Sequence, residues 1–154
     1  MHKPINKKIM KKILLAFLLC FTVLGVYADD WNDGIKEMVA SMNEEAADME
    51  EQMASMGLDV KIKSYYNASK KEIVMDMRFK DASMWGLFDK NVMEVSKQST
   101  IEEYRTSYKT DDDFREFVHM MKEQKAKFKI IYSCEVGGEV KTKDFTITAE
   151  EIMK

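Results

Sequence analysis

The chain has 154 residues, of which 45% are hydrophobic and 33% charged, and its 24 basic and 27 acidic side chains give a formal net charge of −3. This length and apolar content are typical of one folded domain and exclude a disordered chain. A single proline and six glycines exclude collagen-like and proline-rich architectures. The mildly acidic balance argues against a dedicated nucleic-acid binder, whose affinity depends on clustered lysine and arginine.

The first 28 residues are typical of a secretory signal peptide. Residues 1–12 carry five lysines and no acid, residues 13–26 carry no charge, and Val26 and Ala28 place small side chains at the −3 and −1 positions of a cleavage site. The uncharged run of about fourteen residues is shorter than the roughly twenty that span a bilayer. We therefore expect cleavage after Ala28, no transmembrane segment in the cleaved protein, and a periplasmic or secreted location.

An alternative for this segment is lipidation at Cys20, because bacterial lipoproteins are cut just before a cysteine. The bulky Leu19 argues against it. Cleavage after Ala28 would remove five lysines and change the formal charge from −3 to −8, which disfavours nucleic acid and anionic membranes as partners. It would also leave Cys134 as the only cysteine, so we expect a buried thiol and a single domain, residues 29–154, that is held by its hydrophobic core.

The first expected element of this domain is a long amphipathic helix. Apolar residues recur at helical spacing at Ile35, Met38, Val39, Met42, Ala46, Met49, Met53 and Met56. The stripe predicts a helix that begins with Asp33 as N-cap and ends at Gly57. Acidic residues between positions 44 and 51 occupy much of the remaining surface, so the helix would bury one face and show an acidic face to water.

Two hairpins and further helices are expected after it. Residues 60–66 and 73–79 alternate apolar and polar side chains, which predicts an antiparallel hairpin with one face in water. Residues 83–108 predict two helical pieces with a break at 97–100. Residues 111–122 predict a third helix, with Thr110 as N-cap and Asp113 as its capping-box partner.

The last expected element is a hairpin of residues 128–134 and 139–147. Gly137 and Gly138 readily supply the positive φ of a type I′ turn. The apolar parity changes near Lys143, which predicts a bulge or an edge position. The fold class is therefore α+β: a four-stranded antiparallel sheet from two hairpins, with helices packed on one face. The order suggests two αββ units, from either a duplication or the general likeness of hairpins.

The closing hairpin carries residues that are similar to those of a known group of proteins. They are Phe128, Ile130 and Tyr132, then the turn Gly137 and Gly138, then Phe145. With the preceding order of elements, they resemble small exported domains of gut Bacteroidetes, often lipoproteins, whose function is unknown. The resemblance implies the fold and the exported location. It implies no activity, because the shared residues belong to the core and the turn. The chain departs from the lipoprotein members in that it lacks a convincing lipidation site.

Few residues are suited to catalysis. His119 is the only histidine in residues 29–154, so a serine or cysteine hydrolase would need it as base, and a structural zinc site would need four nitrogen or sulfur ligands. We expect no enzyme activity, no metal and no cofactor. One alternative is a carboxylate-based hydrolase, since acids are plentiful. Another is a copper-binding protein, since thioethers bind Cu(I) and the sequence is rich in methionine, although the methionine stripe is better explained as core.

We therefore expect a non-catalytic binding module whose partner is a protein, a peptide or an envelope component. The candidate binding surface is the open face of the sheet in the first hairpin. Its residues have the charged or aromatic parity of the two strands and are Lys61, Lys63, Tyr65, Asp76 and Arg78. Exposed aromatic side chains of this kind often anchor contacts.

Overall fold

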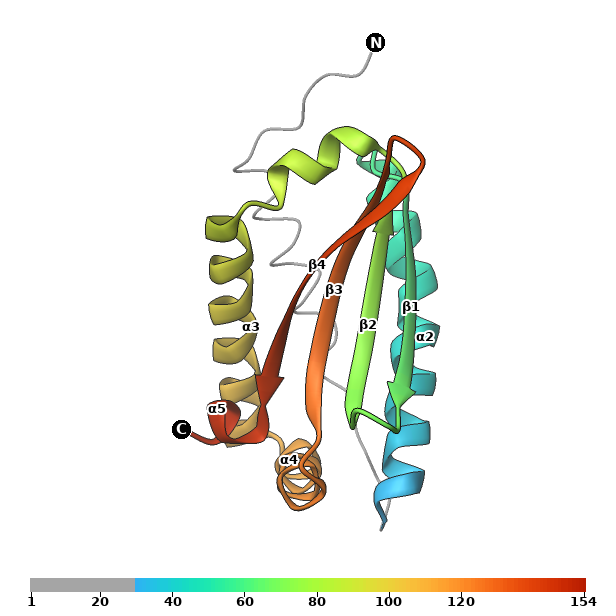
Figure 1. The fold of residues 1–154 in the computed structure, drawn as a ribbon. Helices are drawn as coiled ribbons and strands as arrows, with labels where there is room; N and C mark the ends of the chain where they lie inside the picture. Colours follow the sequence, from blue (N-terminus) through green and yellow to red (C-terminus); the bar gives the residue numbers. More distant parts are fainter. Residues whose placement is uncertain (1–29) are drawn as a thin grey trace.

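The computed structural model describes residues 30–154 (Figure 1). The expected signal peptide, its cleavage site and Cys20 lie outside the described residues. The elements in chain order are α2 (Trp31–Ser55), β1 (Val60–Asn67), β2 (Glu72–Phe79), the 3-10 helix η1 (Ala82–Leu87), α3 (Lys90–Thr110), α4 (Asp112–Gln124), β3 (Lys127–Val136), β4 (Glu139–Thr148) and α5 (Ala149–Met153). The fold is α+β, and no helix in this part of the chain is long and apolar enough to cross a membrane.

The four strands form one sheet in the order β1-β2-β3-β4. Both hairpins are antiparallel, but β2 and β3 run parallel, so the sheet is mixed and the prediction of a purely antiparallel sheet was wrong. The helices between β2 and β3 carry the chain back to the end of the sheet where β2 began, and a crossover of that kind is what joins parallel strands (Figure 1). Two αββ units repeated on one face would instead place β3 parallel to β1 and antiparallel to β2.

All the long helices contact the same face of the sheet. Trp31 at the start of α2 stacks on Phe117 of α4 with ring centroids 5.5 Å apart. The ring centroids of Tyr104 in α3 and Phe128 in β3 are 5.0 Å apart. The methionine stripe of α2 is part of this core as far as Met53: the exposed fractions of Met42, Met49 and Met53 are 3%, 4% and 2%. Met56, the last expected member of the stripe, is the C-cap of the helix and is 54% exposed. The expectation that the opening helix is sheltered by the later strands is confirmed.

Two helices begin near the predicted residues but with different caps. The N-cap of α2 is Asp30, whose carboxylate accepts a hydrogen bond from the Asp33 amide at 2.8 Å. The N-cap of α4 is Asp111 instead of Thr110, and its carboxylate accepts from the amides of Asp113 and Phe114. Aspartate is as good a cap as threonine or better, and several neighbouring acids made the position ambiguous in the sequence.

The expected break at residues 97–100 is absent, because α3 is one continuous helix after the short η1. Ser96 and Thr100 are buried, and the Thr100 hydroxyl donates to the Ser96 carbonyl at 2.7 Å. This bond satisfies the hydroxyl within the helix, so small polar residues can occupy a packed stripe. The prediction failed because the sequence pattern counts such residues as solvent-facing.

Strand β4 lies at the edge of the sheet and contains no bulge, since its register with β3 is continuous. The change of parity has another cause. Lys143 is paired with Tyr132 and therefore lies on the core face. Its ammonium group sits 4.7 Å from the centre of the Trp85 ring and donates to the Phe88 carbonyl. Trp85 and Phe88 therefore stabilise a charged side chain on the core face, where the alternating pattern predicted an apolar residue.

Candidate binding surface

The structure brings together the five residues that the sequence predicts as a binding surface. In the register of β1 and β2, Lys61 is opposite Arg78 and Lys63 is opposite Asp76, while Tyr65 follows two residues along β1. All five have the parity that points away from the helices, and 36% of Tyr65 is exposed. They form one continuous patch, which we call the outer patch, on the outer face of the first hairpin.

The outer patch carries three cations and one carboxylate, Asp76, which stands opposite Lys63 and offsets only part of the positive charge. Side chains directly opposite each other in an antiparallel pair are about 5 Å apart at Cβ, where like charges repel. Lys61 and Arg78 stand in this relation, and neither they nor Lys63 form an ion pair within residues 30–154. The carboxylate of Asp76 instead accepts a hydrogen bond from the Ser133 hydroxyl at 3.4 Å. The patch is therefore a local cationic site.

The opposite end of the same face is closed by an ionic cluster. The side chain of Glu72 is only 6% exposed and lies between the ammonium groups of Lys127 and Lys129, each 3.8 Å from one of its oxygens. Val74, between this cluster and the outer patch, is buried as well. These charges are paired within the protein, so the cluster is a structural feature and the unpaired cations of the face lie in the outer patch.

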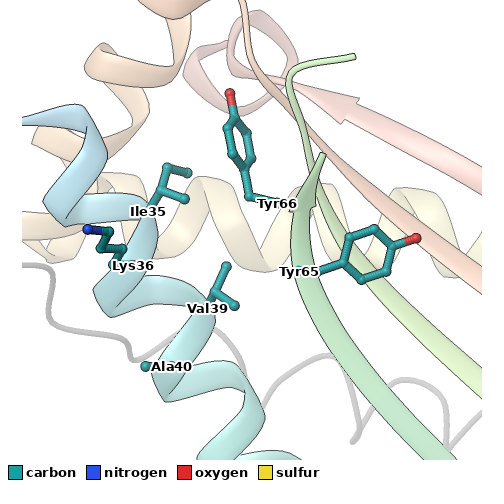
Figure 2. A pocket seen from close by; sticks show the side chains of 6 residues that line it. All are labelled: Ile35, Lys36, Val39, Ala40, Tyr65 and Tyr66. Atoms are coloured by element: carbon teal, nitrogen blue, oxygen red, sulfur yellow. The ribbon is translucent and has the colours of Figure 1, made fainter. Parts of the chain in front are cut away.

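A pocket lies beside the outer patch, at the free edge of β1 (Figure 2). Its volume is about 350 Å³. The lining residues are Ile35, Lys36, Val39 and Ala40 of α2 and Tyr65 and Tyr66 of β1. Figure 2 shows the ring of Tyr65 directed away from α2, so the space next to Val39 is filled by neither tyrosine ring. The walls are mainly aliphatic and aromatic, and none of the lining residues is a carboxylate.

Side chains of α2 cap the edge of β1 beyond this pocket. The side-chain amide of Asn43 accepts from the Ser64 amide and donates to the Ser64 carbonyl, both at 2.9 Å. The carboxylate of Glu50 accepts from the Ile62 amide at 2.8 Å. These bonds replace those of a neighbouring strand and block the edge against a second chain. Sequence reasoning missed both residues and the pocket, because a polar residue on the exposed side of a helix carries no signal of what it contacts.

The residues that could support catalysis are not arranged as a catalytic set. His119 is exposed, and its Nε2 atom lies 3.1 Å from the Tyr108 hydroxyl. Cys134 is fully buried, and burial, with a smaller effect of Asp81, raises the pKa of its thiol to about 11. A thiol in this state is a poor nucleophile. Within residues 30–154 no three histidine, cysteine or acidic side chains are close enough to hold a metal ion.

Three buried side-chain oxygens in the described part of the chain have no hydrogen-bond partner: Glu45 Oε2, Ser64 Oγ and the Tyr132 hydroxyl. Burial raises the pKa of Tyr132, and the opposing effect of hydrogen bonding by the Ser96 hydroxyl is smaller. Since the ring stacks on Phe88 in the closed interior, this tyrosine is a core residue.

No family model, curated protein or solved structure matches this chain. Functional conclusions therefore depend on the geometry of its own residues.

Proposed function

We propose that this protein is an exported, non-catalytic binding protein, which holds a negatively charged protein, peptide or envelope component on its outer patch. The observation that carries the proposal is the meeting of three unpaired cations, Lys61, Lys63 and Arg78, beside the exposed Tyr65. Facing like charges destabilise a sheet unless something outside the fold compensates for the repulsion.

Two physical arguments support a binding role for this patch. The chain after the expected cleavage has a formal charge of −8. A cationic patch on such an acidic protein attracts an anionic partner to that one part of the surface. Tyr65 adds a rigid aromatic surface at the end of the cationic row, and buried aromatic and arginine side chains supply most of the energy of typical interfaces.

The charge argument is tested by retention on immobilised heparin, a sulfated polymer. We expect the protein to be retained at low salt despite its net negative charge, and the double variant Lys61→Ala/Arg78→Ala to elute at lower salt. The matched control is Lys109→Ala/Lys122→Ala, which removes two exposed lysines from helices α3 and α4 and makes the same change in net charge. Equal elution of the two double variants would contradict a specific role of the outer patch.

The partner argument is tested by pull-down from envelope extracts. Tyr65→Ala/Arg78→Ala should lose a partner that the wild type retains at low salt and releases at high salt. If the set of captured proteins and glycans is the same for the wild type and the variant, the outer patch is not the binding surface. Thermal unfolding of both proteins shows that the variant is folded.

A further inference from the structure

We propose that the pocket at the β1 edge binds an extended peptide segment, which forms a two-bond backbone pair with Tyr66 and places an aliphatic side chain against Val39 and Ala40. This site uses the strand edge and the helix. It shares Tyr65 with the outer patch but none of the charged residues of that patch, which lie on the face of the sheet. The partner is a peptide with an aliphatic residue next to an acidic one.

The first step concerns the direction of the Tyr66 backbone. In an antiparallel pair, the amide and carbonyl of one residue point the same way, and this direction alternates along the strand. The Ser64 amide and carbonyl bond to α2, and so does the Ile62 amide, so these groups point away from β2. Tyr66 lies two residues after Ser64. Its amide and carbonyl therefore also point away from β2, toward the space that α2 borders.

The second step concerns what α2 offers at that position. Asn43 and Glu50 supply the hydrogen bonds that a neighbouring strand would give to Ser64 and Ile62. One turn earlier the helix presents Val39 and Ala40, whose side chains have no hydrogen-bonding group. Within residues 30–154 no side chain caps the Tyr66 amide or carbonyl. The Val60 amide and carbonyl and the Ile62 carbonyl are not capped by any described side chain either, but Tyr66 is the open position beside which the pocket lies.

The third step concerns the size and polarity of the pocket. Its volume of about 350 Å³ falls at the lower end of the range of small-ligand sites, about 300–1,000 Å³. Ile35 and Val39 supply aliphatic wall, and Ala40 leaves room where a larger residue would fill it. Lys36 belongs to the same lining, is exposed, and forms no ion pair in the described part of the chain. This combination fits an aliphatic side chain with an acidic neighbour.

A peptide fits these groups better than other occupants do. An aliphatic carboxylate would use the apolar wall and Lys36 but would leave the Tyr66 amide and carbonyl without partners. A peptide residue can exchange two hydrogen bonds with Tyr66, which is the closely spaced pair of an antiparallel ladder. Addition of a strand to an exposed edge is a recurrent way to recognise peptides, in which the backbone gives affinity and pockets give specificity.

The experiment is a titration of the ¹⁵N-labelled protein with the peptide acetyl-Glu-Leu-Val-amide, followed by NMR. We expect the amide signals of Tyr66 and Ala40 to shift on binding. The same peptide with a methyl group on the leucine nitrogen loses one backbone donor, and we expect it to bind at least about tenfold more weakly, a difference of about 1.4 kcal/mol.

The matched variants are Ala40→Phe and Ala47→Phe. Both alanines are exposed on α2, but only Ala40 lines the pocket. We expect Ala40→Phe to weaken peptide binding at least about tenfold and Ala47→Phe to leave it unchanged, with both variants as thermally stable as the wild type within a few degrees.

Four results would overturn the proposal. The first is equal binding of the methylated and unmethylated peptides, which would show that no backbone pair forms. The second is unchanged binding to Ala40→Phe. The third is tighter binding of decanoate than of the peptide at this pocket, which would assign it to aliphatic carboxylates. The fourth is a dimer of the wild type that Ala40→Phe abolishes, which would make a second copy the occupant.

Discussion

Replacement of Asn43 by alanine should measure how far the cap on the β1 edge contributes to stability. The amide of Asn43 makes two hydrogen bonds of 2.9 Å with the backbone of Ser64, a residue that is 3% exposed. In the variant the Ser64 amide and carbonyl would lose both partners. Water could reach them only where the side chain of Asn43 had been, between α2 and the strand edge.

The expected magnitude follows from these contacts. A typical protein hydrogen bond contributes about 0.5–1.5 kcal/mol, so two contribute about 1–3 kcal/mol. Alanine has a higher helix propensity than asparagine, which returns up to about 0.7 kcal/mol at this position in α2. We therefore expect Asn43→Ala to lower the free energy of unfolding by about 0.3–2.3 kcal/mol.

The assay is urea unfolding followed by circular dichroism, with two further variants. Gln52→Ala changes an exposed polar residue of the same helix and should have an effect within about 0.5 kcal/mol of zero. Asn43→Asp keeps an acceptor for the Ser64 amide but loses the donor to its carbonyl, so its effect should exceed that of Gln52→Ala. If Asn43→Ala is as stable as Gln52→Ala, the two hydrogen bonds do not hold the edge.

Three further predictions concern buried polar groups. Tyr132→Phe removes a hydroxyl that has no hydrogen bond in the described structure, so it should leave the melting temperature unchanged or raise it. Burial raises the pKa of the Cys134 thiol from 9.0 to about 11, so the unfolded chain loses this proton first, and urea titrations should show stability falling as the pH rises from 9 to 11. For the same reason the thiol should react with Ellman's reagent at pH 8 only after unfolding. Glu72→Gln removes the charge between two lysines and should cost about 1–3 kcal/mol in the free energy of unfolding, with a smaller loss at high salt.

Helix α2 and the two hairpins could be predicted from the sequence because the spacing of their apolar residues fits only one kind of secondary structure. Steps of three and four residues placed the methionines of α2 in the core, and alternation placed both hairpins. The direction of β3 relative to β2 could not be predicted in this way. An alternating strand presents the same apolar face in either direction, and the choice depends on where α3 and α4 return the chain.

The outer patch could be predicted for the same reason, since alternation alone decides which face Lys61 and Tyr65 occupy. The caps at the β1 edge could not. Asn43 and Glu50 lie seven residues apart on α2, and helical periodicity places them on its polar side, where water is the default neighbour. Only the packing of the helix along the outermost strand turns these polar side chains toward backbone groups.

The two edges of the sheet are protected by different means, and this difference explains where the protein can accept a peptide. Strand β4 carries the exposed Lys141, and a lysine on an edge strand disfavours pairing with another chain. The edge of β1 is capped by hydrogen bonds from α2 instead, and caps of this kind act only at the residues they reach. They protect Ile62 and Ser64 and end before Tyr66, where the helix changes to aliphatic residues. Tyr66 is the open position of this edge that lies next to an apolar pocket. Its amide and carbonyl can pair with one residue of a peptide, and the comparison of Ala40→Phe with Ala47→Phe tests the part of the pocket in that pairing directly.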